Sequence, residues 1–155
     1  MSAEPNDQHF MARALDLARA ARAQDEVPVG AVLVQNGVII AEGKNEVETR
    51  QDATAHAEML AIAGAQAKLH SWRLGGTTLY VTKEPCPMCA GALAHARVDR
   101  IVFGVTDPKA GACGGAFNLF ELPGLNHRCE ITPGVEAEAS LQLLQDFFRE
   151  KRAAG

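Results

Sequence analysis

Stretches with helical periodicity alternate with short β-type stretches along this chain, and this alternation limits the fold more than any other feature of the sequence. The predicted order is a helix, a hairpin, a helix, a strand, a helix, a strand, an irregular segment and a final helix. Strands separated by helices favour an α/β fold in which a central mixed sheet carries helices on both faces. We expect helices over residues 7–24, 54–68, from Pro85 or Pro87 to about 96, and 135–151, with strands over residues 29–34, 38–41, 77–82 and 100–105.

Local signals refine several of these boundaries. Asn36-Gly37 separates two apolar runs, and both residue types tolerate positive φ, which predicts a tight hairpin turn. Thr54 is the expected N-cap of the second helix, because its hydroxyl oxygen can accept from a free backbone N–H. The glycine-rich stretch 107–115 is expected to be a loop. The buried side of the last helix is expected to consist of Leu141, Leu144, Phe147 and Phe148.

Length and composition limit the broad class of protein. A chain of 155 residues with no low-complexity tract or linker is expected to form a single domain over residues 1–155. No apolar run approaches the roughly 20 residues of a membrane-spanning helix, and the polar stretch 1–8 has no secretion-signal pattern. We therefore expect a cytoplasmic protein without a membrane partner. The net charge of −4 weakens non-specific nucleic-acid binding but leaves room for a local basic patch.

Two short motifs carry metal-binding chemistry. His56 and Glu58 lie near the start of one expected helix, and Cys86 and Cys89 lie at the start of another. One imidazole nitrogen and two sulfurs are a ligand set that zinc favours. The two cysteines, three residues apart, share one helical face, and a helix N-terminus favours the thiolate that binds metal. Two helix starts aimed at one point would bring the three ligands together.

The number of ligands indicates a catalytic site. Three protein ligands leave one position of a tetrahedral Zn²⁺ open, and water in that position has its pKa lowered toward ~7, so that hydroxide becomes available. Deamination also needs a group that protonates a ring nitrogen and then the departing amine. Glu58 is the candidate for this proton transfer, and we do not expect it to be a ligand.

Other interpretations of the cysteines remain open from the residues alone. A Cys-x-x-Cys pair also occurs in structural zinc sites and in redox pairs, but a redox pair leaves the His56-x-Glu58 motif unexplained. Cys113, in the glycine-rich loop, is a weak candidate for a fourth ligand, and Cys129 is expected to be a partly buried thiol. Zinc with an adjacent proton-transferring glutamate is a pattern described for deaminases.

Taken together, the motifs resemble a known family. HAE (56–58) with EPCPMCAGA (84–92) is similar to the zinc signature of the cytidine deaminase-like superfamily. Further stretches resemble the bacterial tRNA-specific adenosine deaminases over nearly the whole chain. These stretches are VPVGAVLV (27–34), GKN (43–45), DATAHAE (52–58), IVFGVTDPKAGA (101–112), NHR (126–128) and DFFREKR (146–152).

The resemblance implies a fold, a reaction and a set of site residues. The implied fold is a three-layer α/β/α sandwich with a central mixed sheet. The implied reaction is hydrolytic deamination of the wobble adenosine of tRNA to inosine with release of ammonia, by a homodimer that binds the tRNA anticodon loop and one Zn²⁺ per chain. The implied metal ligands are His56, Cys86 and Cys89, with Glu58 as the proton shuttle. The implied substrate contacts are Asn45, Val29, Asp107, Phe148 and Arg152.

Alternatives to this function remain. Lys83, Glu46 and Ala53 depart from the family pattern, and Glu46 stands where a basic residue is common. The cations after residue 148 also suit a helix C-terminus without any RNA. The runner-up is a deaminase of a free base or nucleoside, such as guanine, cytosine or cytidine. A non-catalytic zinc-binding subunit is a different class, and the presence of Glu58 argues against it.

Overall fold

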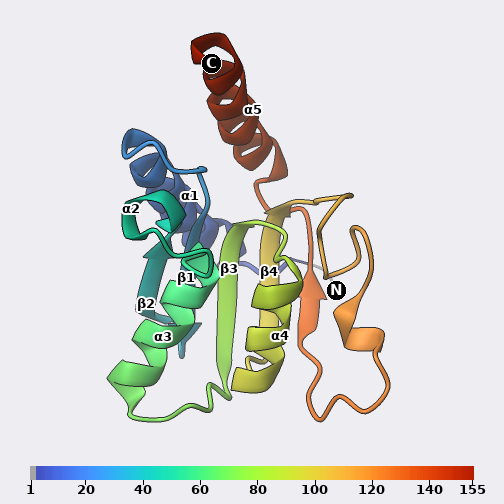
Figure 1. The fold of residues 1–155 in the computed structure, drawn as a ribbon. Coiled ribbons are helices and arrows are strands. Elements are labelled where there is room, and N and C mark those ends of the chain that lie inside the picture. The colour runs from blue at the N-terminus through green and yellow to red at the C-terminus, as the bar shows by residue number, and fades with distance from the viewer. Residues whose placement is uncertain (1–2) are drawn as a thin grey trace.

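The computed structural model describes residues 3–155, which form a five-stranded mixed sheet with helices on both faces (Figure 1). This arrangement confirms the three-layer α/β/α fold. Among these residues, no helix is long and apolar enough to span a bilayer. The elements are α1 (Asp7–Ala23), β1 (Gly30–Gln35), β2 (Val38–Lys44), α2 (Val47–Arg50), α3 (Ala57–Leu69), β3 (Thr77–Lys83), α4 (Pro87–Ala96), β4 (Arg100–Val105), the 3-10 helix η1 (Leu119–Glu121), β5 (Glu130–Thr132) and α5 (Ala137–Ala154).

The strand order determines which loops meet. The strands lie in the order β2-β1-β3-β4-β5, with β1 antiparallel to both β2 and β3, and with β3, β4 and β5 parallel to one another. The carboxyl ends of β3 and β4, the start of β1 and the end of β2 therefore share one edge of the sheet. Loops at the carboxyl ends of parallel strands are a frequent position for ligand sites in α/β proteins. We refer to this side of the sheet as the site edge.

Alternating side chains of the central strands fill two separate cores. Leu33, Leu79 and Ile101 point to one face and pack with residues of α3 and α4. Val32, Tyr80 and Val102 point to the other face and pack with α1. Each strand thus buries both of its faces, which explains its nearly continuous apolar sequence. As a result, α3 and α4 lie side by side on one face (Figure 1).

The predicted start of the second helix is wrong. Thr54 is not the N-cap, because its backbone N–H and its hydroxyl both donate to Asp52 Oδ1, at 2.8 and 2.7 Å. Because of this local turn, the helix starts later in the sequence than predicted. The first residue of α3 is Ala57, and His56 occupies the N-cap position. His56 therefore precedes the first turn of α3 rather than lying within it. The Asn36-Gly37 turn is confirmed, with positive φ at both residues.

The predicted buried side of the last helix is only half correct. Leu144 and Phe147 are buried, but Leu141 and Phe148 are 41% and 42% exposed. The start of α5 lies close against β4, where a Cβ at Gly104 would overlap the Ser140 hydroxyl. Figure 1 shows the later turns of α5 projecting beyond the sheet, where fewer partners are available to cover its apolar side chains.

Candidate active site

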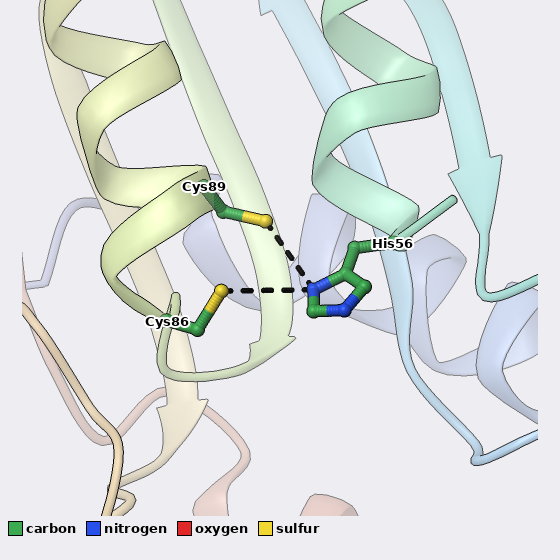
Figure 2. Close-up of side chains that lie close together, drawn as sticks. All are labelled: His56, Cys86 and Cys89. Atoms are coloured by element: carbon green, nitrogen blue, oxygen red, sulfur yellow. Dashed lines mark hydrogen bonds between the residues drawn. The ribbon is translucent and has the colours of Figure 1, made fainter. Parts of the chain in front are cut away.

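Two helix starts bring the three candidate metal ligands together. His56 is the N-cap of α3, Cys86 is the N-cap of α4, and Cys89 lies in the first turn of α4. Figure 2 shows the two sulfurs facing the imidazole ring across the gap between these helices. His56 Nδ1 lies 3.7 Å from Cys86 Sγ and 3.5 Å from Cys89 Sγ. All three ligand atoms lie within 4.8 Å of one another.

The donor set and its spacing fit a zinc ion. Zinc bonds of about 2.1 Å to nitrogen and 2.3 Å to sulfur at a tetrahedral angle place the two donors roughly 3.6 Å apart. The observed N···S distances of 3.5 and 3.7 Å agree with that separation. Within residues 3–155, this group is the one cluster of at least three ligand-type side chains, and Cys113 is not part of it. The weaker expectation of a fourth cysteine ligand therefore finds no geometric support.

The electrostatics of the two sulfurs favour a cation. A hydrogen bond from Cys89 lowers the pKa of Cys86 to about 4, although burial acts in the opposite direction. The same contact, together with burial, raises the pKa of Cys89. The hydrogen bond with Cys86 also raises the pKa of His56. One sulfur is therefore negatively charged at neutral pH, beside an imidazole, and a divalent cation would allow both sulfurs to be thiolates.

Glu58 lies next to the ligands but outside their cluster. Its side chain is only 4% exposed, in the first turn of α3, and it lines the same cavity as His56 and Cys86. Burial raises the pKa of Glu58 to about 7. A carboxyl group with such a pKa can both accept and release a proton near neutrality.

A cavity of about 490 Å³ opens over these groups at the site edge. Its size is within the range of small-molecule sites. Four of the five expected substrate contacts line it, whereas Arg152 lies apart in a groove along α5. The lining residues are Glu26, Val27, Val29, Asn45, Val47, Glu48, His56, Ala57, Glu58, Lys83, Glu84, Cys86, Asp107, Ala110 and Phe148.

The sheet edge explains why residues far apart in the sequence meet in this cavity. Val29 directly precedes β1 and Asn45 directly follows β2, and the backbone N–H of Asn45 donates to the Val29 carbonyl at 3.1 Å. Asp107 follows β4, and Phe148 reaches the cavity from α5. The cavity is therefore lined by the segments that precede β1 and follow β2, β3 and β4, by the start of α3 and by Phe148 of α5.

Several cavity residues were not singled out from the sequence as site residues. Buried Glu26 accepts from the backbone N–H groups of Glu48 and Thr49, at 3.1 and 2.6 Å, and holds α2 at the rim of the cavity. Lys83 Nζ lies 3.3 Å from Asp107 Oδ2. No local pattern identifies such residues, because an isolated Glu or Lys in a sequence reads as a solvated side chain.

Comparison with known proteins shows relatives over nearly the whole chain. The sequence pattern of the MafB19-like deaminase family matches residues 5–152. A tRNA-specific adenosine deaminase of Bacillus subtilis (strain 168) is 50% identical over 146 residues, covering 94% of this chain and 91% of that protein. A solved structure from a study of A-to-I editing by tRNA:A34 deaminases has a TM-score of 0.83 at 43% identity, covering 88% of this chain and 99% of the other. A guanine deaminase from Nitrosomonas europaea has a TM-score of 0.78 at 31% identity, covering 95% and 85%.

Proposed function

Because this chain belongs to the MafB19-like deaminase family, we propose that it hydrolyses the wobble adenosine of tRNA to inosine and releases ammonia. The observation that carries this proposal is the group of His56, Cys86 and Cys89 beside the buried carboxyl of Glu58, at a cavity of about 490 Å³. The tRNA-specific adenosine deaminase that is 50% identical over 146 residues supports the choice of substrate.

The proposed reaction requires a zinc ion, and three side chains are available to bind it. His56 Nδ1 and the sulfurs of Cys86 and Cys89 would hold one zinc ion per chain. When bound, zinc supplies the Lewis acidity that makes a water molecule acidic enough to attack at neutral pH.

Glu58 moves the protons of the reaction. Its carboxylate takes the proton that water loses as oxygen bonds to C6 of adenine, and delivers that proton to ring nitrogen N1. It then takes the hydroxyl proton and passes it to the amino group, so that the C6–N bond breaks and ammonia leaves. A pKa of about 7, raised by burial, suits a group that must first accept and then donate.

The cavity walls hold the base in place. The Asn45 side-chain amide can hydrogen-bond to the edge of a purine, and Val29 provides an apolar wall. Asp107 and Phe148 also line the cavity, and we expect them to contact a nucleotide turned out of an RNA loop. Arg152 lies outside the cavity, and we expect it to contact a phosphate of the same loop. We also expect the active form to be a homodimer.

A free purine is the second candidate substrate. The likeness to the Nitrosomonas europaea guanine deaminase, at 31% identity, favours it specifically. The test compares turnover of an adenosine-containing anticodon stem-loop with turnover of guanine, cytosine and cytidine. We expect inosine at the wobble position of the stem-loop. Activity confined to the free compounds would overturn the tRNA assignment.

Substitution of Glu58 separates metal binding from proton transfer. Glu58→Ala should keep about one zinc per chain and lose at least roughly 100-fold in kcat, because a positioned acid–base group contributes about that much or more. Elemental analysis and single-turnover kinetics measure the two quantities. Full activity of this variant would contradict the proton-transfer role.

The ligand assignment has its own test. His56→Ala or Cys86→Ala should reduce the zinc content well below one per chain, because two donors hold zinc far more weakly than three. Cys129→Ala serves as the control, since Cys129 is a buried thiol of the core outside the ligand group. Normal zinc content in His56→Ala would contradict the assignment.

A further inference from the structure

Glu84 directly precedes the turn that carries the metal ligands Cys86 and Cys89. Both oxygens of its buried carboxylate accept hydrogen bonds from the backbone. Its side chain is 3% exposed, and it lies between the end of β3 and Cys86. Oε1 accepts from the backbone N–H of Asp107 at 2.9 Å. Oε2 accepts from the backbone N–H groups of Cys113 and Gly115, at 2.9 and 2.8 Å. Three backbone N–H groups from one loop therefore converge on one carboxylate.

That loop, residues 106–115, is the rim loop of the cavity. It contains no helix or strand, and backbone hydrogen bonds such as that from the N–H of Gly111 to the Asp107 carbonyl, at 2.9 Å, hold its turns. Asp107 and Ala110 line the cavity. A further hydrogen bond, from the N–H of Ala112 to the Pro85 carbonyl at 2.9 Å, ties the rim loop to the same turn.

Two glycines make this arrangement possible. A Cβ added at Gly111 or at Gly115 would overlap the carboxylate of Glu84 and the backbone carbonyl of Asp107. Neither glycine has the positive φ that would by itself require glycine. Their lack of a side chain is therefore explained by the close approach of the rim loop to Glu84.

We infer that Glu84 is a positioning residue that fixes the rim loop relative to the turn carrying Cys86, and so sets how tightly the nucleotide substrate is held. This inference rests on the proposed deaminase function. Glu84 also lines the cavity, but both of its oxygens accept from rim-loop N–H groups, so we expect its effect on the substrate to act through the rim loop and its cavity residues Asp107 and Ala110. The proton shuttle Glu58 and the ligand His56 lie at the start of α3, whereas the hydrogen bonds of Glu84 described above all go to the rim loop.

Glu84→Gln tests the inference with little change of shape. In either orientation of the glutamine amide, its NH2 group replaces a carboxylate oxygen that accepts from at least one backbone N–H. Because NH2 cannot accept, that N–H loses its partner. We expect KM for the stem-loop to rise roughly 10-fold with a smaller change in kcat, because an unsatisfied buried donor loosens the rim loop rather than the proton shuttle. Zinc content should stay at about one per chain. Hydrogen exchange of the Asp107, Cys113 and Gly115 amides should be roughly 10-fold faster.

Glu26→Gln is the matched control. Glu26 is another buried cavity carboxylate held by backbone N–H groups, but those groups belong to α2. Exchange in the rim loop should be unchanged in this variant. Gly115→Ala should raise KM and speed amide exchange in the same way, because its Cβ would overlap the Glu84 carboxylate. This second variant keeps Glu84 itself and tests the inference if Glu84→Gln does not fold.

The outcomes separate this inference from the proposed function. Unchanged KM and unchanged rim-loop exchange in Glu84→Gln would overturn it. Loss of zinc from Glu84→Gln would also overturn the inference, because it would show that Glu84 positions the metal ligands instead of the rim loop. If the parent protein acts only on free guanine, the tRNA proposal fails, while the exchange comparison still decides the role of Glu84.

Discussion

At the scale of single residues, the cavity combines several carboxyl groups with one ammonium group. Its lining includes Glu26, Glu48, Glu58, Glu84 and Asp107, and among the described residues that line it Lys83 is the single lysine or arginine. Lys83 Nζ lies 3.3 Å from Asp107 Oδ2, while Asp107 Oδ1 accepts from the backbone of Lys109. An RNA phosphate arriving at this rim would meet Lys83 as its cationic partner.

Replacement of Lys83 should therefore act on substrate binding. We expect Lys83→Leu to raise KM for the anticodon stem-loop by roughly 5-fold at low salt, an effect of about 1 kcal/mol. The slope of log KM against log salt should fall by about 0.7, as for one lost contact to single-stranded nucleic acid. Steady-state kinetics at several salt concentrations measure both quantities.

The control is Lys68→Leu, which makes the same change in net charge at an exposed position near the end of α3, remote from the cavity. It should leave KM and its salt slope at the parental values. Equal effects of the two variants would show that only net charge matters and that Lys83 has no contact of its own.

At the scale of secondary-structure elements, the position of α3 determines where His56 lies. Gly43 of β2 lies directly under the first turn of this helix, and a Cβ there would overlap the carbonyl of Ala57 and approach the N–H of Ala61 at 2.9 Å. The helix can approach the sheet this closely because Gly43 has no side chain. His56, one residue before α3, is carried by the same contact.

Gly43→Ala is expected to weaken both folding and metal binding. Forcing a methyl group into this contact should cost about 1–3 kcal/mol of stability. It should also lower zinc affinity, because α3 moves His56 away from the sulfurs on α4. Thermal unfolding of the metal-free protein and a competition titration with a zinc chelator measure the two effects.

Gly64→Ala provides the comparison on the same helix. A Cβ at Gly64 would meet Ala41 Cβ at an ordinary 3.5 Å, and the residue lies in the exposed middle of α3. This change should stabilise the protein by roughly 0.5–1 kcal/mol through helix propensity and leave zinc affinity unchanged. Equal zinc affinity in both glycine variants would refute the dependence of the site on the contact at Gly43.

At the scale of the whole molecule, one buried ionic network joins the start of the chain to the middle of the sheet. Asp7, at the first residue of α1 and 1% exposed, accepts from Arg100 at 2.8 Å and from the Tyr80 hydroxyl at 2.9 Å. Arg100 also donates to Thr132 of β5 at 3.0 Å. The network thus connects α1 with β3, β4 and β5.

This network should make stability depend on acid pH. Burial raises the pKa of Asp7, but hydrogen bonds from Arg100, Glu4 and Tyr80 together outweigh it and hold the pKa below the ordinary value of 3.8. A pKa that is lower in the folded state gives stabilisation that is complete above about pH 4 and is lost as pH falls through the folded value.

Asp7→Asn tests this dependence. The variant should lose about 3 kcal/mol at pH 7, as expected when one partner of a buried pair is removed. Its stability should also decline less steeply than that of the parent below about pH 4. Urea unfolding between pH 2 and pH 7 provides the comparison, with Asp16→Asn as the control at an exposed ion pair. Parallel pH profiles for parent and Asp7→Asn would contradict the prediction.

The sequence by itself determined the features that are encoded over a few neighbouring residues. The hairpin at Asn36-Gly37, the strand 100–105 and the grouping of Cys86 with Cys89 depend on local backbone preferences and on spacing within one helical turn. For the same reason, short β5 and α2 were not predicted, because three or four residues carry too little periodic signal.

Only the tertiary structure decided what depends on segments far apart in the chain. It brought His56 to within 3.7 Å of Cys86, gathered the rim loop around Glu84, and left Arg152 outside the cavity. It also left Leu141 and Phe148 exposed, although both belong to the apolar pattern of α5. Burial of a charge or an apolar side chain depends on which distant elements pack around it, and those contacts form only when the strands are ordered in one sheet.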